Sequence, residues 1–589
     1  MEKSDLAGNA VTFLHDEDYL NAFQTPHITA DTWLNVTNRQ GYALNGDWGF
    51  AIDPFDTGFR QRWFEYGADT VPRAHDWNPY QAETCTLPGV WNLFAPELFH
   101  FEGGVWFARQ IDDIRTAPDN RLILHIGAAN YCARVFVGGR FIGRHLGGST
   151  PFSVDISDHV QGRTMVLIHV ENHRQPDRLP SHHFDWLHYG GLHRDIALYD
   201  LPAEHIRDVF ARLDGDDVVV DVDTTAGLSF AQVDIPALNL SAEVPLTGGQ
   251  GQLRVAAKPR LWSPDDPFLH DVTVTAGTDT LHDRIGFRHI ETSGNRVLIN
   301  GQPTFLKGVC VHEDDAETGR VTSPEDIRRR FRHARELGAN FLRLAHYPHH
   351  TDVARIADEE GLMLWAEIPA YWSIRFDDPG TRADAQNQLA ELVRRDRNRA
   401  SVILWGLANE TADTPPRNAF LADLAALARR LDPSRPLAAA CLFNQDTLTM
   451  QDRLAQVIDV VGINQYFGWY DDNINDLRRI LDQYDLNKPL VISETGCDVL
   501  AGDQGPADAA NSEAFGVRYY QNQIATVEGH DAVAGFVPWL LYDFRSARRQ
   551  NGAQRGWNRK GLIADDKTTY KQVFHTLRDF YARLNETEG

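Results

Sequence analysis

This 589-residue sequence lacks the features by which membrane, secreted and nucleic-acid-binding proteins are usually recognised. No apolar run approaches the roughly 18–20 residues that a membrane span needs. The N-terminus has no basic segment followed by an apolar stretch, so no signal peptide is expected. Basic residues are also few: 57 Lys and Arg stand against 82 Asp and Glu, a formal net charge of −25. Such an acidic surface argues against nucleic acids and anionic membranes as partners.

Cysteine is scarce as well. The five cysteines are scattered and odd in number, and they lack the spacing of metal ligands: Cys85, Cys132, Cys310, Cys441 and Cys497. We interpret them as reduced thiols in the core, which favours a cytoplasmic protein over a secreted one with a disulfide framework. We expect neither a metal nor another cofactor.

What the chain does have is length and aromatic surface, with 10% aromatic residues and 14 Trp. It is too long for one core, so about three or four domains are expected. In the first part, strand-like runs such as 121–126, 133–137 and 165–170 are separated by Gly, Asn and Asp turns, which predicts a β-sandwich over residues 1–202. The shorter strand-rich region 203–292 predicts a small immunoglobulin-like sandwich.

After residue 293, apolar strands alternate with helical stretches. Ser323 opens one of these helices with a capping box, and Gly338 closes it. This alternation is typical of a (β/α)8 barrel, which we expect over residues 293–589. The strand candidates are Phe305–Val311, Phe341–Ala345, Met363–Ile368, Val402–Ala408, Leu437–Phe443, Val460–Asn464, Leu490–Ser493 and Gly535–Leu541.

Two glutamates end two of these apolar runs. Glu410 follows the fourth strand candidate and Glu494 follows the seventh. A carboxylate is costly beside a buried strand unless it has a task, and the C-terminal ends of barrel strands form the working face of such a fold. Two carboxyls facing one bond are what glycoside hydrolysis requires. Glu367, in the third strand candidate, is instead expected to pair with a basic neighbour inside the barrel.

Other polar and aromatic residues stand at the same ends of the strands, where a purely structural core would have Val, Ile and Leu. His312 and His346 are balanced between substrate contact and a structural role. Trp539 suits either core packing or stacking on the apolar face of a sugar. The remaining candidates by position are Asn409, Asn464 and Tyr466.

A basic segment follows the eighth strand candidate. Residues 545–560 carry six Lys and Arg and no acid, in a chain of net charge −25. One interpretation is a solvated loop that is neutralised by acids elsewhere. The other is short-range recognition of an anionic substrate group, such as the C5 carboxylate of an acidic sugar.

The motifs of the chain resemble glycoside hydrolase family 2, and in detail its β-glucuronidases, over about residues 40–580. The resemblance implies a jelly-roll, sugar-binding-like first sandwich, an immunoglobulin-like second sandwich and a catalytic TIM barrel. It rests on the segments Leu87–Asn92, Gly104–Trp106, Gly147–Phe152, Phe184–Asp195, Gly308–Asp314, Asn340–Pro348, Gly406–Glu410, Asn464–Tyr470 and Asn558–Lys560.

The resemblance also implies roles for single residues. Glu410 is the expected acid/base and Glu494 the expected nucleophile. Asn558 and Lys560 match the Asn-x-Lys motif that grips a uronate carboxylate, while Arg555 lies one residue closer to this motif than the family pattern has it. The other residues implied to bind substrate are Asp185, His312, His346, Asn409, Asn464, Tyr466, Tyr470 and Trp539.

The function implied is a retaining, exo-acting β-glucuronidase. Its substrate is then a glucuronide or an oligosaccharide that ends in a uronic acid, and the protein is expected to be a cytoplasmic homo-oligomer, either a dimer or a tetramer. A β-galacturonidase, a neutral β-galactosidase or β-mannosidase and a non-catalytic carbohydrate-binding protein remain as alternatives. After Trp372 the chain reaches its next helix quickly, without the long loop of some bacterial relatives, so we expect an open site that admits large aglycones.

Overall fold

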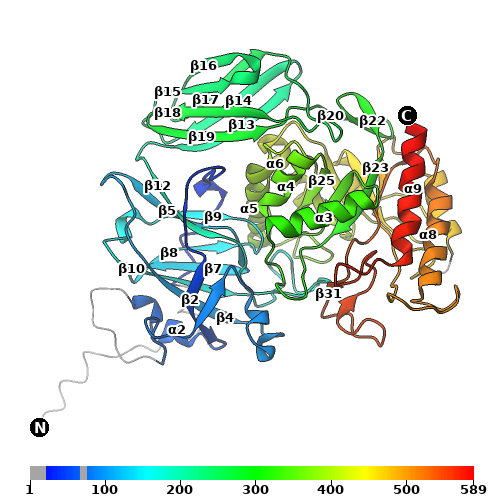
Figure 1. Cartoon of the computed structure of the whole chain (residues 1–589), viewed down its shortest axis with the longest axis horizontal. Helices are drawn as coiled ribbons and strands as arrows, with labels where there is room; N and C mark the ends of the chain where they lie inside the picture. Colours follow the sequence, from blue (N-terminus) through cyan, green and yellow to red (C-terminus); the bar gives the residue numbers. More distant parts are fainter. Residues whose placement is uncertain (1–21, 67–75, 472, 589) are drawn as a thin grey trace, which may run out of the picture.

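The computed structural model describes residues 22–66, 76–471 and 473–588, with the side chains of 586–588 left aside. The N-terminal segment considered above for a signal peptide lies outside these residues. Figure 1 shows two β-sandwiches, one from the blue and cyan part of the chain and one from the green part, beside a barrel of strands and helices. The expected fold class is therefore confirmed, whereas the domain boundaries near residues 202 and 292 stay predictions.

The first sandwich consists of two antiparallel sheets, with strand orders β1-β12-β5-β9 and β3-β2-β4-β10-β7-β8. Residues from both sheets, such as Val135 and Leu124, share one buried cluster. A short α2 (Thr57–Arg60) lies beside it. The strands are Tyr42–Ala43 (β1), Gly46–Asp53 (β2), Thr84–Leu87 (β3), Gly104–Ile111 (β4), Arg121–Ile126 (β5), Ala129–Asn130 (β6), Cys132–Val137 (β7), Arg140–Leu146 (β8), Phe152–Asp155 (β9), Thr164–Glu171 (β10), Gly191–Leu192 (β11) and Ile196–Leu201 (β12).

The second sandwich packs a three-stranded sheet, β13-β14-β17, against a four-stranded sheet, β16-β15-β18-β19. Valines alternate with polar residues along β18, so one of its faces is buried in the core and the other is solvated. The strands are Ile206–Asp214 (β13), Asp217–Thr224 (β14), Phe230–Ile235 (β15), Leu240–Pro245 (β16), Gln250–Ala256 (β17), His270–Ala276 (β18) and Asp279–Ile285 (β19).

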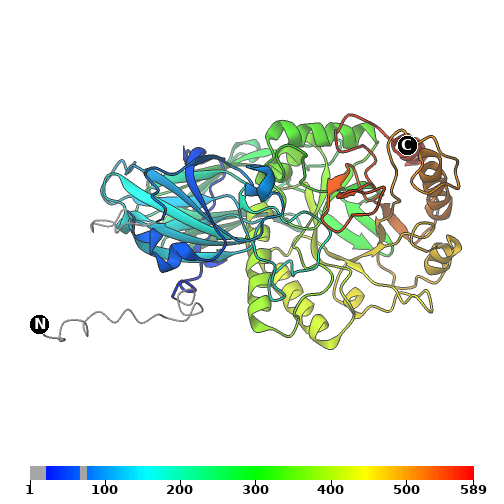
Figure 2. The same ribbon diagram turned by 90° about the horizontal axis from the view of Figure 1, so that it is seen from below.

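The third part is a closed barrel of eight parallel strands, β23 to β30, preceded by a small sheet of β20, β21 and β22. Figure 2, viewed at right angles to Figure 1, shows the helices arranged around the strands. The strands are Ile290–Ser293 (β20), Arg296–Ile299 (β21), Gln302–Thr304 (β22), Leu306–Val311 (β23), Phe341–Leu344 (β24), Met363–Glu367 (β25), Val402–Asn409 (β26), Leu437–Cys441 (β27), Val460–Asn464 (β28), Leu490–Glu494 (β29) and Val533–Phe536 (β30).

The barrel helices are amphipathic segments that cover the strands. Helix α3 begins with the predicted capping box, in which Ser323 and Asp326 bond reciprocally, and Gly338 lies just beyond its end with a φ of +87°. The helices are Pro324–Glu336 (α3), Thr351–Glu360 (α4), Pro379–Asp396 (α5), Pro415–Leu431 (α6), Asn475–Asp482 (α7), Glu513–Val527 (α8) and Gln572–Glu588 (α9); two short strands, Phe544–Arg545 (β31) and Trp557–Asn558 (β32), pair after β30.

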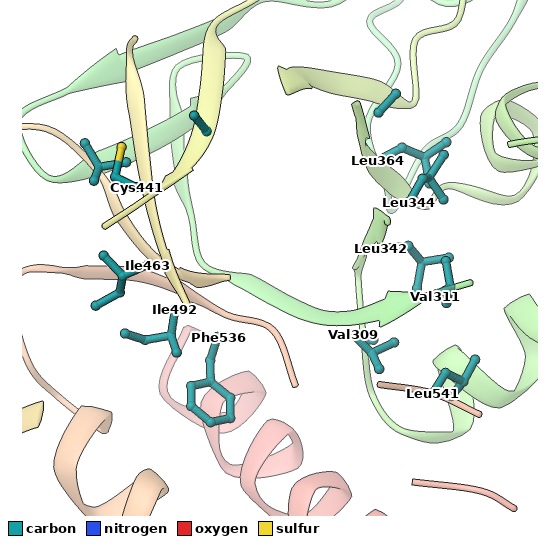
Figure 3. Packing of buried hydrophobic residues seen from close by; sticks show 14 of the residues in the cluster. Val309, Val311, Leu342, Leu344, Leu364, Cys441, Ile463, Ile492, Phe536 and Leu541 are labelled. Atoms are coloured by element: carbon teal, nitrogen blue, oxygen red, sulfur yellow. The ribbon is translucent and has the colours of Figure 1, made fainter. Parts of the chain in front are cut away.

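Alternation along the barrel strands separates two layers of the core. Val309 and Val311 belong to the layer between strands and helices, which Figure 3 shows around the ring of strands, whereas Cys310 between them belongs to the inner layer. Both sides of each strand are therefore buried, which explains the near-continuous apolar runs in the sequence. All five cysteines are free and buried, as expected for core thiols.

Seven of the eight predicted barrel strands agree with the structure to within two residues at each end, and the eighth differs. β30 ends at Phe536, not at Leu541, so Trp539 lies beyond the strand and not within it. Pro538 has no N–H to continue a ladder of hydrogen bonds, which accounts for the early end. No helix in the described parts of the chain is both long and apolar enough to cross a bilayer.

Candidate active site

Glu494 is the last residue of β29, and its carboxylate lies among three polar groups. Arg343 Nη1 donates to Oε1 at 2.8 Å, and the Tyr466 hydroxyl donates to Oε2 at 2.7 Å. His346 Nε2 lies 3.6 Å from Oε1. Both oxygens are thus held by donors, an arrangement that stabilises the ionised form of a carboxyl.

Glu410 follows β26 directly and has a φ of +49°, in the left-handed region that a non-glycine residue rarely adopts. The Trp372 indole Nε1 donates to its Oε2 at 2.7 Å, and Asn409 Nδ2 lies 3.4 Å from the same oxygen. Trp372 also has a positive φ, of +54°. Strained backbone of this kind is tolerated where the surroundings fix it, and it is common at functional sites.

Burial raises the pKa of both carboxyls above the usual range of a glutamate. The charge of Glu410 adds to the rise at Glu494, whereas the Arg343 guanidinium and the Tyr466 hydroxyl lower that pKa. Two such carboxyls titrate as a pair, and a single negative charge is most stable beside a full positive charge. We therefore place the charge on Glu494 and the proton on Glu410, whose hydrogen-bond donor Trp372 is neutral.

Arg343, on β24, is a site residue that the sequence analysis did not identify. Its side chain is fully buried and donates to Glu367 as well as to Glu494, with Nη2 3.1 Å from Glu367 Oε1. The pairing expected for Glu367 inside the barrel is therefore confirmed. A charged residue within the apolar run of β24 was the available signal, because a buried guanidinium needs an anionic partner.

Asn409 and Asn464 form a hydrogen-bonded pair behind the carboxyls. Asn409 Oδ1 accepts from Arg343 Nη2 at 2.7 Å and from Asn464 Nδ2 at 3.0 Å. Asn464 Oδ1 in turn accepts from Ser493 Oγ at 2.8 Å. These bonds fix the amide of Asn409 with its oxygen toward Arg343, which leaves its nitrogen toward Glu410.

The two candidate histidines stack on aromatic rings in the same site. His346 Nδ1 lies 2.8 Å from Glu367, and its ring stacks on Trp539 with centroids 5.0 Å apart. His312 stacks on Phe544 at 4.3 Å, and its Nε2 has no partner within the described residues. Burial holds the pKa of both imidazoles well below its usual range, so both rings are neutral.

Asp185 brings the first sandwich into the site. Its carboxylate accepts from Ser546 Oγ at 2.6 Å, from Arg549 Nε at 3.0 Å and from Asn558 Nδ2 at 3.4 Å. Arg549 Nη1 also donates to the hydroxyl of Tyr470 at 3.1 Å. The loop after β30 is thereby tied to a residue that lies 361 positions before Ser546 in the chain.

Tyr470 lies between Lys560 and Tyr466 in a series of contacts. The buried Nζ of Lys560 pairs with Asp498 Oδ1 at 2.9 Å and lies 5.2 Å from the centroid of the Tyr470 ring. That ring is 5.3 Å from the ring of Tyr466, whose hydroxyl bonds to Glu494. A continuous set of contacts therefore links Lys560 to the carboxyl pair.

The remaining cations of segment 545–560 fall into two groups. Arg559 pairs with Asp543 at 3.3 Å and with Asp565 at 2.5 Å, so it is neutralised like Arg549 and Lys560. Arg545 donates to the carbonyl oxygen of Ala316 at 2.7 Å. Neutralisation by acids elsewhere, one of the two interpretations of the charge pattern, thus applies to half of the segment's cations.

Arg548 and Arg555 have no acidic partner in the described parts of the chain. The exposed side chain of Arg555 donates to the carbonyl oxygen of Gly552 within its own loop, and within the described residues it contacts none of the other candidate residues. Arg548 lies over the indole of Trp372, 4.6 Å from the ring centroid.

A barrel with two carboxyls at the ends of its fourth and seventh strands, one of them held by an arginine and a tyrosine, has the site of a glycoside hydrolase. Comparison with protein families gives the same class. Residues 290–585 match the TIM barrel domain of glycosyl hydrolases family 2, and residues 42–202 match the sugar binding domain of that family. A further family 2 domain matches residues 205–288. The chain belongs to glycosyl hydrolase family 2, as its motifs indicated.

Similar proteins are found among curated sequences and solved structures. The chain is 28% identical to the β-glucuronidase of Paenibacillus borealis, with 94% of this chain and 98% of that protein covered. The β-glucuronidase of Rattus norvegicus is also 28% identical, with 94% and 92% covered. A solved β-glucuronidase from an uncultured Clostridium sp. has a TM-score of 0.82 at 26% identity, with 95% and 99% covered. The β-galacturonidase of Eisenbergiella tayi, at 23% identity and a TM-score of 0.80, covers 95% and 98% and shares the fold.

Proposed function

We propose that this glycoside hydrolase is an exo-acting, retaining β-glucuronidase. The observation that carries the proposal is the chain of contacts from Lys560 through Tyr470 and Tyr466 to Glu494, with Asn558 bonded to the backbone of Lys560. A uronate differs from a neutral sugar in its C5 carboxylate, and an ammonium with an amide beside it offers the charge and the donors that this carboxylate needs. The β-glucuronidases to which the chain is similar support the same substrate class.

The proposed reaction has two steps. In the first, Glu494 attacks the anomeric carbon, the bond from that carbon to the leaving oxygen breaks, and Glu410 transfers its proton to this oxygen. In the second, Glu410 takes a proton from water, and the water oxygen displaces Glu494 from the anomeric carbon. Each step inverts the configuration, so the product keeps that of the substrate.

The surrounding residues prepare these two roles. Arg343 and Tyr466 hold the carboxylate of Glu494 by both oxygens, which fixes the direction of attack. Asn409 has its oxygen occupied, so its amide nitrogen is the group available to the 2-hydroxyl of the sugar. A hydrogen bond at that hydroxyl strengthens as charge develops in the transition state.

Lys560 can hold Asp498 and a substrate carboxylate at once. An ammonium group has three N–H donors, and Asp498 takes one of them. Asn558 receives the backbone N–H of Lys560 on its Oδ1, at 3.2 Å, so the motif is internally braced. We infer that Asp498 positions the ammonium while the remaining donors face the uronate.

The test is a panel of aryl β-glycosides that carry glucuronate, galacturonate or galactose, assayed with the unchanged enzyme and with Lys560→Ala. We expect glucuronide to be the best substrate. Lys560→Ala should lower kcat/KM for glucuronide by about 100-fold or more, since a charge-assisted contact is lost, and should change the galactoside value far less.

Asp498→Asn is the matched control for folding, because it breaks the same buried pair from the other side. If both variants lose the same stability in urea but Lys560→Ala loses much more of the discrimination between glucuronide and galactoside than Asp498→Asn, which keeps the ammonium, the lysine binds the uronate. Equal losses on charged and neutral sugars would contradict the proposal. Preference for galacturonide would replace it with a β-galacturonidase.

We further propose that the enzyme is a cytoplasmic homo-oligomer. The five free, buried cysteines support a reducing compartment. Light scattering of the purified full chain at several concentrations would distinguish the expected dimer or tetramer from a monomer.

A further inference from the structure

The segment after β25 forms one wall beside the acid/base carboxyl. Trp372 donates its indole N–H to Glu410 at 2.7 Å, and the guanidinium of Arg548 lies over the same indole, 4.6 Å from its centroid. The carboxyl of Glu410, the indole of Trp372 and the guanidinium of Arg548 therefore contact one another in that order. The outermost of them, Arg548, is exposed to solvent.

The chemistry of the proposed reaction defines which part of a substrate meets this wall. Glu410 must reach the oxygen that leaves with the aglycone, because it donates its proton to that atom. The aglycone therefore lies on the side of Glu410, next to Trp372. Arg548, stacked on Trp372, is placed to meet groups attached to the aglycone and not the uronate itself.

Arg548 differs from the neighbouring cations of its segment. Arg549, Arg559 and Lys560 each pair with an aspartate, whereas Arg548 has neither an acidic partner nor a hydrogen bond within the described residues. Its charge is therefore available to a ligand. A cation stacked on an aromatic ring keeps a defined position while its N–H groups remain free to donate.

The first sandwich closes the same side of the site. Ser181 Oγ donates to the carbonyl oxygen of Ser373 at 2.5 Å, so the loop that carries Ser181 lies against the residue after Trp372. His182 and His183 follow in this loop, with ring centroids 4.0 Å apart, and both are exposed. Imidazole rings at this position add further donors and no negative charge.

The overall charge of the protein makes a local cation necessary for an anionic aglycone. At a net charge of −25 the chain repels anions at long range. Only a positive group within a few ångströms of the bound aglycone overcomes that repulsion, since such contacts are screened far less than distant charges.

We propose that Trp372 and Arg548 form an aglycone subsite that selects β-uronides whose leaving group carries a carboxylate or sulfate. The proposal rests on the uronidase function proposed above and names the part of the substrate that the function leaves open. An aromatic ring or a sugar ring in the aglycone packs on Trp372, and its anionic substituent pairs with Arg548.

Two fluorogenic β-glucuronides with the same aromatic scaffold test the proposal. 4-Methylumbelliferyl glucuronide has a neutral aglycone, and 3-carboxyumbelliferyl glucuronide has an aglycone that carries a carboxylate. For each enzyme, the ratio of kcat/KM for the carboxylated over the neutral substrate is measured at low salt. Arg548→Gln is expected to lower this ratio by about three- to tenfold, because one exposed charge-assisted contact is lost. Arg548→Lys, which keeps the charge but not the planar stacking group, should lie between.

Arg332→Gln is the control for net charge, since Arg332 is an exposed arginine on the outer helix α3. It should leave the ratio within about twofold. Raising NaCl to about 0.5 M should reduce the ratio of the unchanged enzyme and remove the difference from Arg548→Gln. A 3-sulfated disaccharide uronide, compared with its unsulfated form, separates sulfate from carboxylate recognition.

The outcomes separate this proposal from the function on which it rests. If neither glucuronide is turned over, the proposed uronidase function fails. If both are turned over but Arg548→Gln changes both values equally or leaves the ratio unchanged, the aglycone subsite is refuted while the uronidase function stands.

Discussion

Arg343 Nη1 lies 2.8 Å from Glu494 Oε1, while Nη2 of the same guanidinium lies 3.1 Å from Glu367 Oε1. One fully buried cation is thus shared by two buried carboxylates. The Arg343 charge lowers the pKa of Glu494, and the charge of Glu367 raises it. Glu367 therefore offsets part of the stabilisation that Arg343 gives to the carboxylate of Glu494.

Replacing Arg343 and replacing Glu367 should move the acid limb of the pH profile in opposite directions. In the proposed mechanism Glu494 reacts as an anion, so activity is lost as pH falls through its pKa. Arg343→Gln removes a charge that lowers this pKa, so the acid limb should move to higher pH, and kcat should fall by about 100-fold or more. Glu367→Gln removes a charge that raises the same pKa, so the limb should move to lower pH.

The measurement is kcat/KM for an aryl glucuronide between pH 3 and pH 9, with far-UV circular dichroism and urea unfolding on each variant. Arg343→Gln leaves two buried carboxylates without their cation, which should cost about 3–5 kcal/mol of unfolding free energy. Shifts of the same sign in both variants would show that the limb reports general loss of structure and not the ionisation of Glu494.

Trp372→Phe should move the alkaline limb to higher pH. Burial raises the pKa of Glu410, and the hydrogen bond from Trp372 lowers it again by stabilising the carboxylate. In the proposed mechanism Glu410 acts as the protonated acid, so activity declines as pH rises through this pKa. Without the indole donor the pKa rises further, and the limb should shift upward by about 0.5–1 pH unit.

Trp539→Phe is the control for this shift, because it also removes an indole from the site. Within the described residues Trp539 makes no hydrogen bond to Glu410. The Trp539 ring stacks on His346, so the substitution should weaken substrate binding without moving the alkaline limb. A downward shift in Trp372→Phe, or equal shifts in both variants, would exclude Trp372 as the group that tunes Glu410.

Much of the barrel could be predicted because its strands are buried on both faces. Such strands appear as apolar runs, and a polar residue at the end of a run, such as Glu410 or Glu494, is conspicuous. The end of the eighth strand was misplaced because the apolar run continues through Val537 and Leu541, beyond Phe536, where the regular strand ends. Hydrophobicity reports burial there and not strand pairing.

The partners of the basic segment were not predictable from charge alone. Counting showed six cations between Arg545 and Lys560, but the acids that neutralise them come from other domains and loops, as with Asp185 and Asp498. Trp372 and Arg549 were missed for the same reason. Their roles depend on contacts between loops that follow different strands, and no local pattern encodes such contacts.

We predict that the carboxylate of Asp185 binds hydroxyl groups of the sugar, in addition to its structural contact between the first sandwich and the barrel. Its carboxylate accepts from Ser546, Arg549 and Asn558, and it stands where the family resemblance implies sugar contact. Asp185→Asn keeps the shape but exchanges an acceptor for a donor. We expect kcat/KM for glucuronide to fall by about 100-fold, and the preference for glucuronide over galacturonide to shrink, because the lost acceptor faced a hydroxyl.

A structural tie would give a different result in a double-mutant cycle. Asp185→Asn strands the charge of Arg549, whereas Asp185→Asn combined with Arg549→Gln leaves no unpaired charge, so the double variant should recover part of the lost stability in urea. If activity and epimer preference recover together with stability, Asp185 serves only to neutralise the charge of Arg549. If stability recovers while kcat/KM for glucuronide stays low, the carboxylate itself binds the sugar, since no other change in the double variant restores an acceptor at that position.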